Sequence, residues 1–520
     1  MKLNTKRTIF VGFAFFLISL FWQAYDATIA LTLTNKFGMN QFWSGVIMAL
    51  DNILALFLLP LFGTLSDKHQ GKSGRRTPFI RFGTIVAAIA LVALSFVDNM
   101  QLDLIKDIST VDDPAALSII YDTQCDKELQ TPDGTKFVLS DKFTKDQFIE
   151  IRSTDDDKDV TNKEEDKAPF TSYVVPARQA YAADQTAANP MPLIIFVSVL
   201  LVLLVAMGIF RSPAVALMPD VTLKPLRSKA NAIINLMGNA GGIIVLLLGM
   251  GFAFGISKAT NAMMSYTPYY LVIAGTMLVA LAIFLCTVRE KEWAAQMQSD
   301  AIRYGIEEAA SQTDQQKKLS KSQAFSLICI LLSVALWYFG YNAVTSKYSV
   351  YAPNVLQMGY SETMLIAQAC AIVSYLPAGI IASKVGRKKT ILAGVTMLAV
   401  AFGAASFMSA GSPVWLMYIL FALAGIAWAT INVNSFPMVV EMCTGSNVGK
   451  YIGFYYTASM AAQTLTPMFS GHLMDKMGMT VLFPYAAIFV ALAFVTMILV
   501  KHGDTKIVSK KGLEALNIED

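Results

Sequence analysis

Long apolar runs alternate with short polar segments along most of the 520-residue chain. A helix needs about 20 apolar residues to cross the hydrocarbon core of a bilayer. Twelve runs of about this length lie at residues 8–34, 42–65, 79–98, 192–217, 230–255, 268–288, 325–350, 361–383, 388–410, 413–438, 450–474 and 480–500. Backbone amides in lipid must be bonded within their own segment, and barrel strands would be about ten residues long. The runs therefore predict twelve transmembrane helices.

The composition agrees with a membrane protein and narrows the possible functions. Hydrophobic residues make up 55% of the chain and charged residues 15%, whereas soluble proteins carry about 25% charged residues. The sequence lacks metal-ligand spacing, a phosphate-binding loop and a nucleophile motif, and its three histidines are far apart. We therefore expect no enzyme activity, no catalytic residues, no metal or other cofactor and no nucleic-acid partner.

Lysines and arginines gather in the segments on one side of the predicted helices. In short loops these residues concentrate on the cytoplasmic side of a membrane. With both termini placed on that side, its segments hold 26 of the 41 lysines and arginines. The short loops opposite hold four, which are Lys36, Lys258, Lys347 and Lys476. The pattern predicts a multi-pass protein of the cell membrane with both termini in the cytoplasm.

Residues 99–190, between the third and fourth runs, form an unusual insertion. They hold 19 acidic and 10 basic residues, and we expect a small extracellular insert there. Alternating patterns at 135–140 and 147–152 predict strands, and Pro132-Asp133-Gly134 predicts a turn. The acidic run at 155–167 is typical of a solvated segment.

The expected fold is an all-α membrane protein in which twelve helices form two pseudo-symmetric six-helix halves. The insert separates helices 3 and 4, and a cytoplasmic linker joins the halves, with a surface helix at 290–310. The predicted parts are helices 1–3 at 1–98, the insert at 99–190, helices 4–6 at 191–288, the linker at 289–324, helices 7–12 at 325–500 and a cytoplasmic tail at 501–520.

Two motifs recur after equivalent helices of the two halves. GTLSDK…GRRTPFI begins at Gly63, and its echo GIIASKVGRKKTI occupies 379–391. A second pair, SPAVALMPD and NSFPMVVE, ends at Asp220 and Glu441 respectively. Weak symmetry between halves is a mark of transporters built from repeats.

On these motifs the chain resembles the major facilitator superfamily over its twelve predicted helices, but not over 99–190. GRRTPFI and ALMPDVTLKPLRSKANAIINLMG (216–238) are similar to sucrose-type carriers of the glycoside–pentoside–hexuronide:cation symporter group. The resemblance implies alternating access, with helices 1, 4, 7 and 10 lining a cavity. It also implies gating residues, which are Asp67 with Arg75 and Arg76, Asp220, Arg227, Arg387 and Glu441. Glu441 is included because Ser383 stands where a second loop acid would correspond to Asp67.

Three ionisable residues fall inside predicted helices, where charge is costly and commonly functional. A rise of about 1.5 Å per residue places Asp26 and Asp51 at comparable levels in the outer half, with Arg211 lower. Two carboxylates at one level could share a proton or bind a cation. Sucrose-type carriers usually have an acid in helix 4, which this chain lacks, so we assign coupling to Asp26 and Asp51. A structural ion pair or an acid reaching the outer surface is the alternative.

Sugar binding needs hydrogen-bonding side chains beside aromatic rings, because a sugar has polar edges and apolar faces. Such residues occur in helices 1, 7 and 10, and Arg211 adds a cation from helix 4. The candidates are Trp22, Gln23, Tyr25, Arg211, Trp337, Tyr341, Asn342, Trp428, Asn432 and Asn434. Packing between helices, or an aromatic belt at the membrane surface, is the alternative for each aromatic residue.

These features predict a monomeric transporter that couples uptake of a small sugar to a proton. A disaccharide or related glycoside of the sucrose or maltose type is the expected substrate. The alternatives are a sodium-coupled, melibiose-like symporter and an exporter of sugars or drugs. A further alternative is a sensor that transports nothing and uses its acidic insert to bind a partner.

Overall fold

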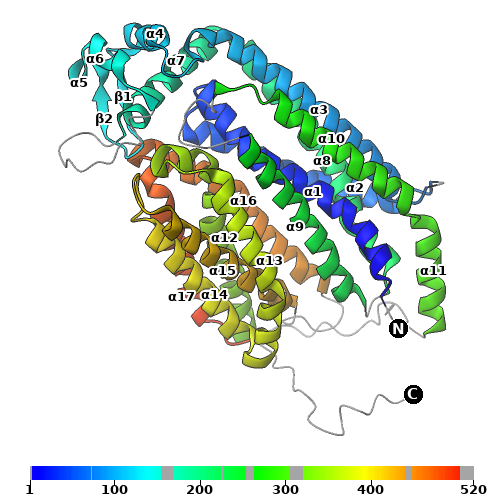
Figure 1. Ribbon diagram of the computed structural model, residues 1–520. Helices are drawn as coiled ribbons and strands as arrows, with labels where there is room; N and C mark the ends of the chain where they lie inside the picture. The colour runs from blue at the N-terminus through cyan, green and yellow to red at the C-terminus, as the bar shows by residue number, and fades with distance from the viewer. Residues whose placement is uncertain are drawn as a thin grey trace.

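The structure is a computed structural model, and it describes residues 3–71, 73–153, 168–223, 226–252, 263–304, 320–440 and 448–503. Twelve long helices form two groups of six, and a compact insert caps one end of them (Figure 1). We call this end the insert side and the opposite end the Asp67 side. Among the described residues, ten of the long helices are apolar enough to cross a membrane, and α13 and α16 complete the twelve.

The first half contains the helices on both sides of the insert. Their bounds are α1 Thr5–Leu31, continued by the π-helix η1 Thr32–Lys36, α2 Gln41–Lys68, α3 Thr77–Leu104, α8 Met191–Val221, α9 Arg227–Gly251 and α10 Thr267–Thr287. The side chain of Asn40 caps α2 by accepting the Trp43 N–H at 2.9 Å. Helix α1 packs along α9, and α3 packs along α8. The predicted apolar runs therefore lie on helices of one bundle.

The second half follows the helix α11, Glu290–Arg303, which lies on the Asp67 side and confirms the predicted surface helix as far as Arg303. The rest of that prediction, 305–310, lies outside the described residues. The bounds of the second half are α12 Lys321–Tyr351, continued by η7 Ala352–Leu356, α13 Tyr360–Val385, α14 Arg387–Ala405, α15 Val414–Val440, α16 Val448–Met477, the short helix η9 Met479–Val481 and α17 Leu482–Ile498.

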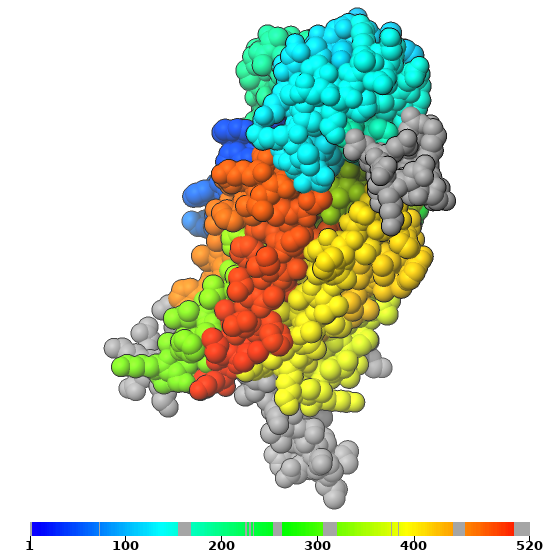
Figure 2. Space-filling view, turned by 90° about the vertical axis from the view of Figure 1, so that its left-hand side faces the viewer, coloured from blue at the N-terminus to red at the C-terminus, as the bar shows by residue number. Residues whose placement is uncertain are grey.

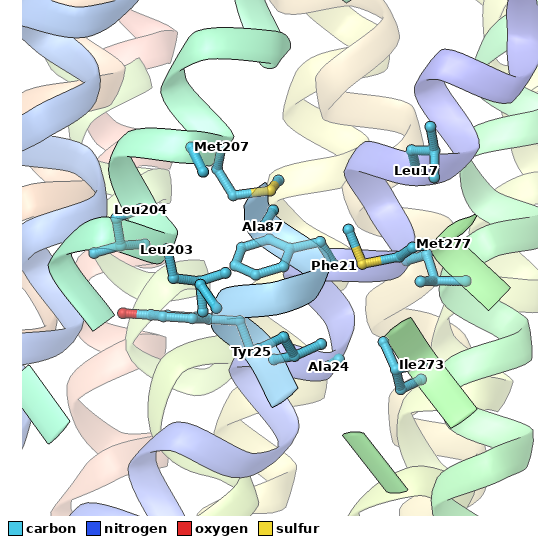
Figure 3. Close-up of a cluster of buried hydrophobic side chains, with 14 of the residues drawn as sticks. Leu17, Phe21, Ala24, Tyr25, Ala87, Leu203, Leu204, Met207, Ile273 and Met277 are labelled. Carbon is cyan, nitrogen blue, oxygen red and sulfur yellow. The ribbon is translucent and has the colours of Figure 1, made fainter. Parts of the chain in front are cut away.

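Each half has its own hydrophobic core, and the core of the first half lies against one wall of the cavity described below. Phe21 is 1% exposed and packs among buried side chains of α8 and α10, such as Leu203 and Met277. Figure 3 shows this cluster, with the Tyr25 ring at its edge and the hydroxyl pointing away from the apolar side chains. Tight packing on one face of α1 therefore fixes the direction of its polar face.

The insert is a small helical unit with one hairpin. Its elements are η2 Lys106–Ile108, α4 Pro114–Gln124, β1 Glu128–Gln130, β2 Lys136–Val138, α5 Leu139–Lys142, α6 Lys145–Glu150, η4 Phe170–Val174 and α7 Val175–Ala188. Strands β1 and β2 pair antiparallel, with Leu129 opposite Phe137. Buried side chains including Phe148 and Phe170 form its core.

The strand predictions for the insert were only partly correct. The first strand, β2, covers the start of 135–140 and gives way to α5, and Gly134 closes the predicted turn with φ of +96°. The second predicted strand, 147–152, is wrong, because most of it belongs to α6. Thr144 and Gln147 form a capping box that begins this helix, which overrides the short alternating pattern. The acidic run at 155–167 lies outside the described residues.

Candidate functional site

A polar cavity of about 170 Å³ lies between the two halves, and we call it the central cavity. Helices α1, α2 and α8 of the first half and α12 and α16 of the second half line it. Its polar and charged side chains are Trp22, Tyr25, Asp26, Asp51, Asn52, Arg211, Asn342, Thr345, Ser346 and Gln463. Two carboxylates and one guanidinium therefore meet among uncharged hydrogen-bonding groups.

Helical spacing explains how these residues converge. Positions i, i+3 and i+4 share one face of a helix. Trp22, Tyr25 and Asp26 have this spacing on α1, and the cavity residues of α2 and α12 repeat it at 48, 51 and 52 and at 342, 345 and 346. Each of these helices thus turns one polar stripe to the cavity and packs its other faces against apolar neighbours.

The three charged residues predicted inside helices line the same cavity. The Asn52 amide donates to the Asp51 carboxylate at 2.7 Å, and the Arg211 guanidinium lies 5.4 Å from the centre of the Trp22 ring. Arg211 lies ten residues before the end of α8 at Val221, and Asp51 lies 17 residues before the end of α2 at Lys68. At about 1.5 Å per residue, Arg211 therefore stays some 10 Å lower than Asp51 along the helices, although both line the same cavity.

Three buried polar atoms at the cavity are unsatisfied. Trp22 Nε1, the Tyr25 hydroxyl and Asn342 Nδ2 have no hydrogen-bond partner within the described part of the chain. All three residues line the central cavity. A buried polar group without a partner costs about 1–3 kcal/mol, so such groups in native structures usually face water or a ligand. The cavity therefore offers two N–H donors and one hydroxyl to a polar molecule.

Other predicted binding residues lie near the cavity or away from it. Gln23 donates to the Tyr360 hydroxyl at 2.9 Å, which joins α1 to α13 of the other half. Tyr341 stacks on Trp428, with ring centres 3.6 Å apart and planes 4° from parallel. Asn432 is hydrogen-bonded to the hydroxyl of Tyr375. These four side chains are committed to contacts within the protein.

Trp337 and Asn434 are not brought to the central cavity. Trp337 is 1% exposed in the core of the second half, and Asn434 is buried and donates to the Thr430 carbonyl at 2.8 Å. At about 100° per residue, Trp337 lies some 140° around α12 from Asn342, on a different face. Their placement favours packing roles over substrate contact.

Four of the predicted gating residues, Asp67, Arg75, Arg76 and Asp220, form a cluster on the Asp67 side. Arg76 donates from Nε to Asp220 at 2.8 Å, from one terminal nitrogen to Ser66 Oγ at 2.5 Å and from the other to Asp67. Arg75 lies 3.4 Å from Asp220. The cluster ties α2, α3 and α8 together, and all of these belong to the first half.

The remaining predicted gating residues lie elsewhere. Arg227 donates to the carbonyls of Pro219 and Thr222 at 3.0 and 3.2 Å, which satisfies the end of α8. Arg387 is the first residue of α14. Glu441 lies outside the described residues.

Glu290 completes the Asp67-side cluster, and the sequence did not point to it. This carboxylate is 3% exposed and accepts the backbone N–H groups of Arg75, Arg76 and Thr77 at 2.7 to 2.8 Å. It also accepts the Thr77 hydroxyl at 2.7 Å. The residue before α3 is Arg76, whose side chain cannot accept the free N–H groups at the start of the helix. An arginine at this position is the one sequence feature that could have indicated an acceptor from another part of the chain.

The insert side holds a second network, and this one joins the halves. Asp475 of α16 accepts the N–H groups of Gln41 and Phe42 at 2.7 and 2.8 Å, which caps α2 of the other half. Lys347 of α12 donates to the Gln41 carbonyl at 2.6 Å. The helices touch closely here, because a Cβ on Gly45 would lie 2.0 Å from the Pro467 carbonyl oxygen. The described hydrogen bonds between the halves thus gather toward the insert side.

Two lysines that were counted in outer loops are fully buried in helices. Lys347 forms the contact just described, and Lys36 pairs with Asp98 at 2.6 Å, with side chains 0% and 1% exposed. Lys36 also lies 3.5 Å from the centre of the Tyr266 ring. Both lysines therefore belong to the helical bundle, and the sequence offered no sign of it because each lies at the polar end of an apolar run.

Two six-helix halves that face one another across a polar cavity are typical of membrane transporters built from repeats. The profile of the Major Facilitator Superfamily matches residues 181–374 and 363–517, and the profile described as MFS/sugar transport protein matches 10–103. The two segments matched by the superfamily profile together span residues 181–517, which is more than half of the chain. The chain belongs to the major facilitator superfamily.

Curated relatives share only part of the chain. The MFS-type transporter ppzB of Metarhizium rileyi (strain RCEF 4871) is 27% identical over 141 residues, which is 27% of this chain and 29% of the relative. The ppzB protein of Metarhizium majus (strain ARSEF 297) is 26% identical over 141 residues, or 27% of this chain and 30% of the relative. The chain thus matches less than a third of the length of either relative.

Solved structures share the fold over nearly the whole chain. The inward open xylose transporter XylE from E. coli has a TM-score of 0.56 and 15% identity, covering 99% of this chain and 100% of that one. An inward-facing bacterial homologue of the iron transporter ferroportin has a TM-score of 0.56 and 13% identity, covering 96% and 99%. A D-xylose-proton symporter has a TM-score of 0.55 and 12% identity, covering 95% and 98%. At these identities the likeness concerns the fold alone.

Proposed function

We propose that the protein carries a disaccharide or related glycoside, of the sucrose or maltose type, together with a proton by alternating access. One observation carries the proposal. Three unpartnered polar atoms, of Trp22, Tyr25 and Asn342, meet two carboxylates in one cavity between the halves. A neutral polar molecule satisfies the first set of groups, and a proton satisfies the second.

The uncharged polar and aromatic side chains among those that line the cavity suit a sugar. Sugar hydroxyls donate and accept hydrogen bonds, so they match an indole N–H, a phenol and a carboxamide. The ring faces of a sugar are apolar and pack on aromatic side chains, which Trp22 and Tyr25 supply. The match of residues 10–103 to the MFS/sugar transport profile and the sugars named for two of the solved structures support the same substrate class.

Charge balance in the cavity suits a single coupled proton. Asp26 and Asp51 carry two negative charges when ionised, and Arg211 carries one positive charge, which leaves a net charge of −1. An uncompensated charge between membrane helices is costly. One proton on either carboxylate makes the set neutral, and in this proposal that neutral set reorients with the sugar.

The arrangement of contacts suits alternating access. Asp475 and Lys347 join the halves on the insert side, whereas the Arg76 cluster on the Asp67 side joins helices of the first half to the linker helix α11. With the insert outside the cell and both termini in the cytoplasm, this conformation is closed to the outside. The sequence GRRTPFI and the stretch 216–238 favour the sucrose-type symporter group within the superfamily.

A sodium-coupled sugar symporter is the second candidate, and one observation favours it. The carboxylates of Asp26 and Asp51 lie in one cavity with the amide oxygens of Asn52 and Asn342. Oxygen clusters of this kind coordinate hard cations. An imposed sodium gradient that drives accumulation without a pH gradient would select this candidate over the first.

The substrate class is tested by counterflow into proteoliposomes. We expect exchange of sucrose, maltose or a related disaccharide, and loss of that exchange in Asn342→Ala, because the sugar loses a carboxamide partner. Asn354→Ala is the matched control, since Asn354 lies on η7 and bonds only to the Val350 carbonyl at 2.9 Å among described residues. Absence of counterflow with every disaccharide and monosaccharide of a panel would reject the sugar proposal.

A further inference from the structure

The insert is fastened to the first half of the transporter. Gln179 of α7 donates to Asn35 at 2.7 Å, and Gln101 of α3 donates to Thr186 of α7 at 2.9 Å. Helix α7 also lies against Gly38 so closely that a Cβ there would be 2.3 Å from the Ala183 nitrogen. The insert therefore moves together with the first half.

The far end of the insert touches the second half through its hairpin turn, residues 131–135. The Met479 N–H donates to the Pro132 carbonyl at 2.7 Å. A Cβ on Gly134 would lie 2.6 Å from the Met477 carbonyl oxygen, and one on Gly478 would lie 2.4 Å from the Asp133 carbonyl carbon. Figure 2 shows the cyan surface of the insert meeting the orange surface of the second half. Two backbone turns therefore meet directly.

The hairpin turn is built to keep its shape. The Asp133 carboxylate accepts the Thr135 N–H at 3.0 Å, and the Thr131 carbonyl accepts the Gly134 N–H at 2.9 Å. A turn that is rigid before it docks loses little conformational entropy on docking. The contact can therefore form and break without refolding of the insert.

The contact between the insert and the second half is narrow. A cavity of about 270 Å³ remains between the hairpin, the start of α2 and the end of α16. Carboxamides that line it already bond within the protein, as Gln130 does to the Gly134 carbonyl and Gln179 does to Asn35. The cavity is thus a gap beside a small contact between the hairpin turn and residues 477–479. Separating the turn from the end of α16 therefore breaks few interactions.

The docked turn lies next to the network that joins the halves. Met477 follows Asp475 by two residues, and Asp475 caps α2 of the first half. A contact that fixes the end of α16 also holds Asp475 in place against α2. The insert and the α2 cap therefore stabilise the same closed arrangement.

We propose that the insert is a conformational strap, whose hairpin turn docks on residues 477–479 and favours closure of the insert side. The turn must leave this site each time that side opens. The proposal rests on the alternating access of the proposed function but on neither its substrate nor its coupling ion. Its first test measures conformation alone, so a wrong substrate assignment leaves that result unaffected.

A buried thiol reports opening of the insert side. Ser44 is 0% exposed on the face of α2 that carries Gly45 and Gln41 toward α16, so Ser44→Cys becomes reactive when the halves part there. The five native cysteines are replaced first. Gly478→Ala should speed labelling by a membrane-impermeant maleimide about tenfold, because losing one hydrogen bond and its packing shifts the equilibrium by about that factor.

Gly411→Ala is the matched control for backbone strain. Gly411 has φ of +82°, close to the +90° of Gly478, but a Cβ on it would meet nothing within 4 Å. We expect its labelling rate to equal that of the parent. Equal rates for Gly478→Ala and Gly411→Ala, whether raised or unchanged, would overturn the proposal.

A reversible cross-link tests whether the strap must release. The 2.7 Å hydrogen bond from Met479 to Pro132, together with backbone bond lengths, keeps their Cα atoms within about 7 Å, the reach of a disulfide. Oxidised Pro132→Cys/Met479→Cys should lose at least nine-tenths of its Ser44→Cys labelling in a triple variant, and reduction should restore it. Unchanged labelling after complete cross-linking, shown by mobility on a denaturing gel, would overturn the strap.

Discussion

Replacing Asp475 with asparagine should open the insert side of the transporter. The carboxylate accepts the Gln41 N–H at 2.7 Å and the Phe42 N–H at 2.8 Å, in the first turn of a helix from the other half. Asparagine keeps one acceptor oxygen, carries no charge and turns an NH₂ group toward the second N–H. The substitution therefore removes one bond between the halves and weakens the other.

The size of this effect follows from the number and kind of bonds. A hydrogen bond to a charged group contributes about 1.5–3 kcal/mol. Loss of one such bond shifts the ratio of closed to open molecules about 10- to 150-fold. Lys347 keeps its 2.6 Å bond to the Gln41 carbonyl, so the variant retains part of the closure.

Double electron–electron resonance can measure the shift. Spin labels at Met191 and Phe407, which are 56% and 84% exposed, report on the insert-side ends of the two halves. A longer distance should gain population in Asp475→Asn, whereas Asp103→Asn, at an exposed site near the end of α3, serves as the control. Identical distance distributions for Asp475→Asn and the parent would refute the reasoning.

Three further outcomes are expected. Glu290→Ala leaves the N–H groups of residues 75–77 without their acceptor, which should destabilise this helix end by about 2 kcal/mol. Hydrogen exchange of these N–H groups should then be about 30-fold faster. Asp67→Asn should slow transport, because it weakens the ion pair with Arg76 on the Asp67 side. Sugar affinity should stay the same, because the Asp67 side chain is 59% exposed and does not line the central cavity. A large loss of affinity would contradict this expectation. Burial raises the pKa of the Asp133 carboxyl, but hydrogen bonds within the hairpin turn outweigh burial and lower this pKa. The ionised Asp133 carboxylate therefore stabilises the turn fully above about pH 4, and this stabilisation is lost as the pH falls through the pKa of Asp133 in the folded protein. The distribution of distances between spin labels on the turn and on η9 should broaden only below about pH 4.

The helical bundle could be predicted because the hydrophobic effect acts on long runs of side chains. The run at 192–217 became α8, Met191–Val221, and the run at 79–98 became α3, Thr77–Leu104. Both helices extend beyond their apolar runs, because their polar ends continue toward the insert on one side and into short loops on the Asp67 side. Asp26, Asp51 and Arg211 could be singled out for a related reason, since a charge inside a membrane helix needs a compensating group.

Other parts of the site could not be predicted because their partners are backbone groups. Glu290 and Asp475 accept N–H groups of distant helix ends, and every residue type except proline offers such a donor. Each acid therefore resembled an ordinary residue at the end of a helix. The predicted strand at 147–152 failed for a local reason, since six alternating residues are a weak signal beside the capping box of Thr144 and Gln147.

Sugar accumulation driven by a pH gradient tests the central claim, which is that Asp26 and Asp51 in the central cavity couple proton movement to sugar transport. Parent protein, Asp26→Asn and Asp51→Asn are compared in proteoliposomes, with Asp103→Asn as the control for loss of a carboxylate elsewhere. We expect accumulation to be lost in at least one of the two cavity variants while sugar counterflow continues, because the cavity can no longer take up and release its proton. Full pH-driven accumulation in both cavity variants would contradict the account.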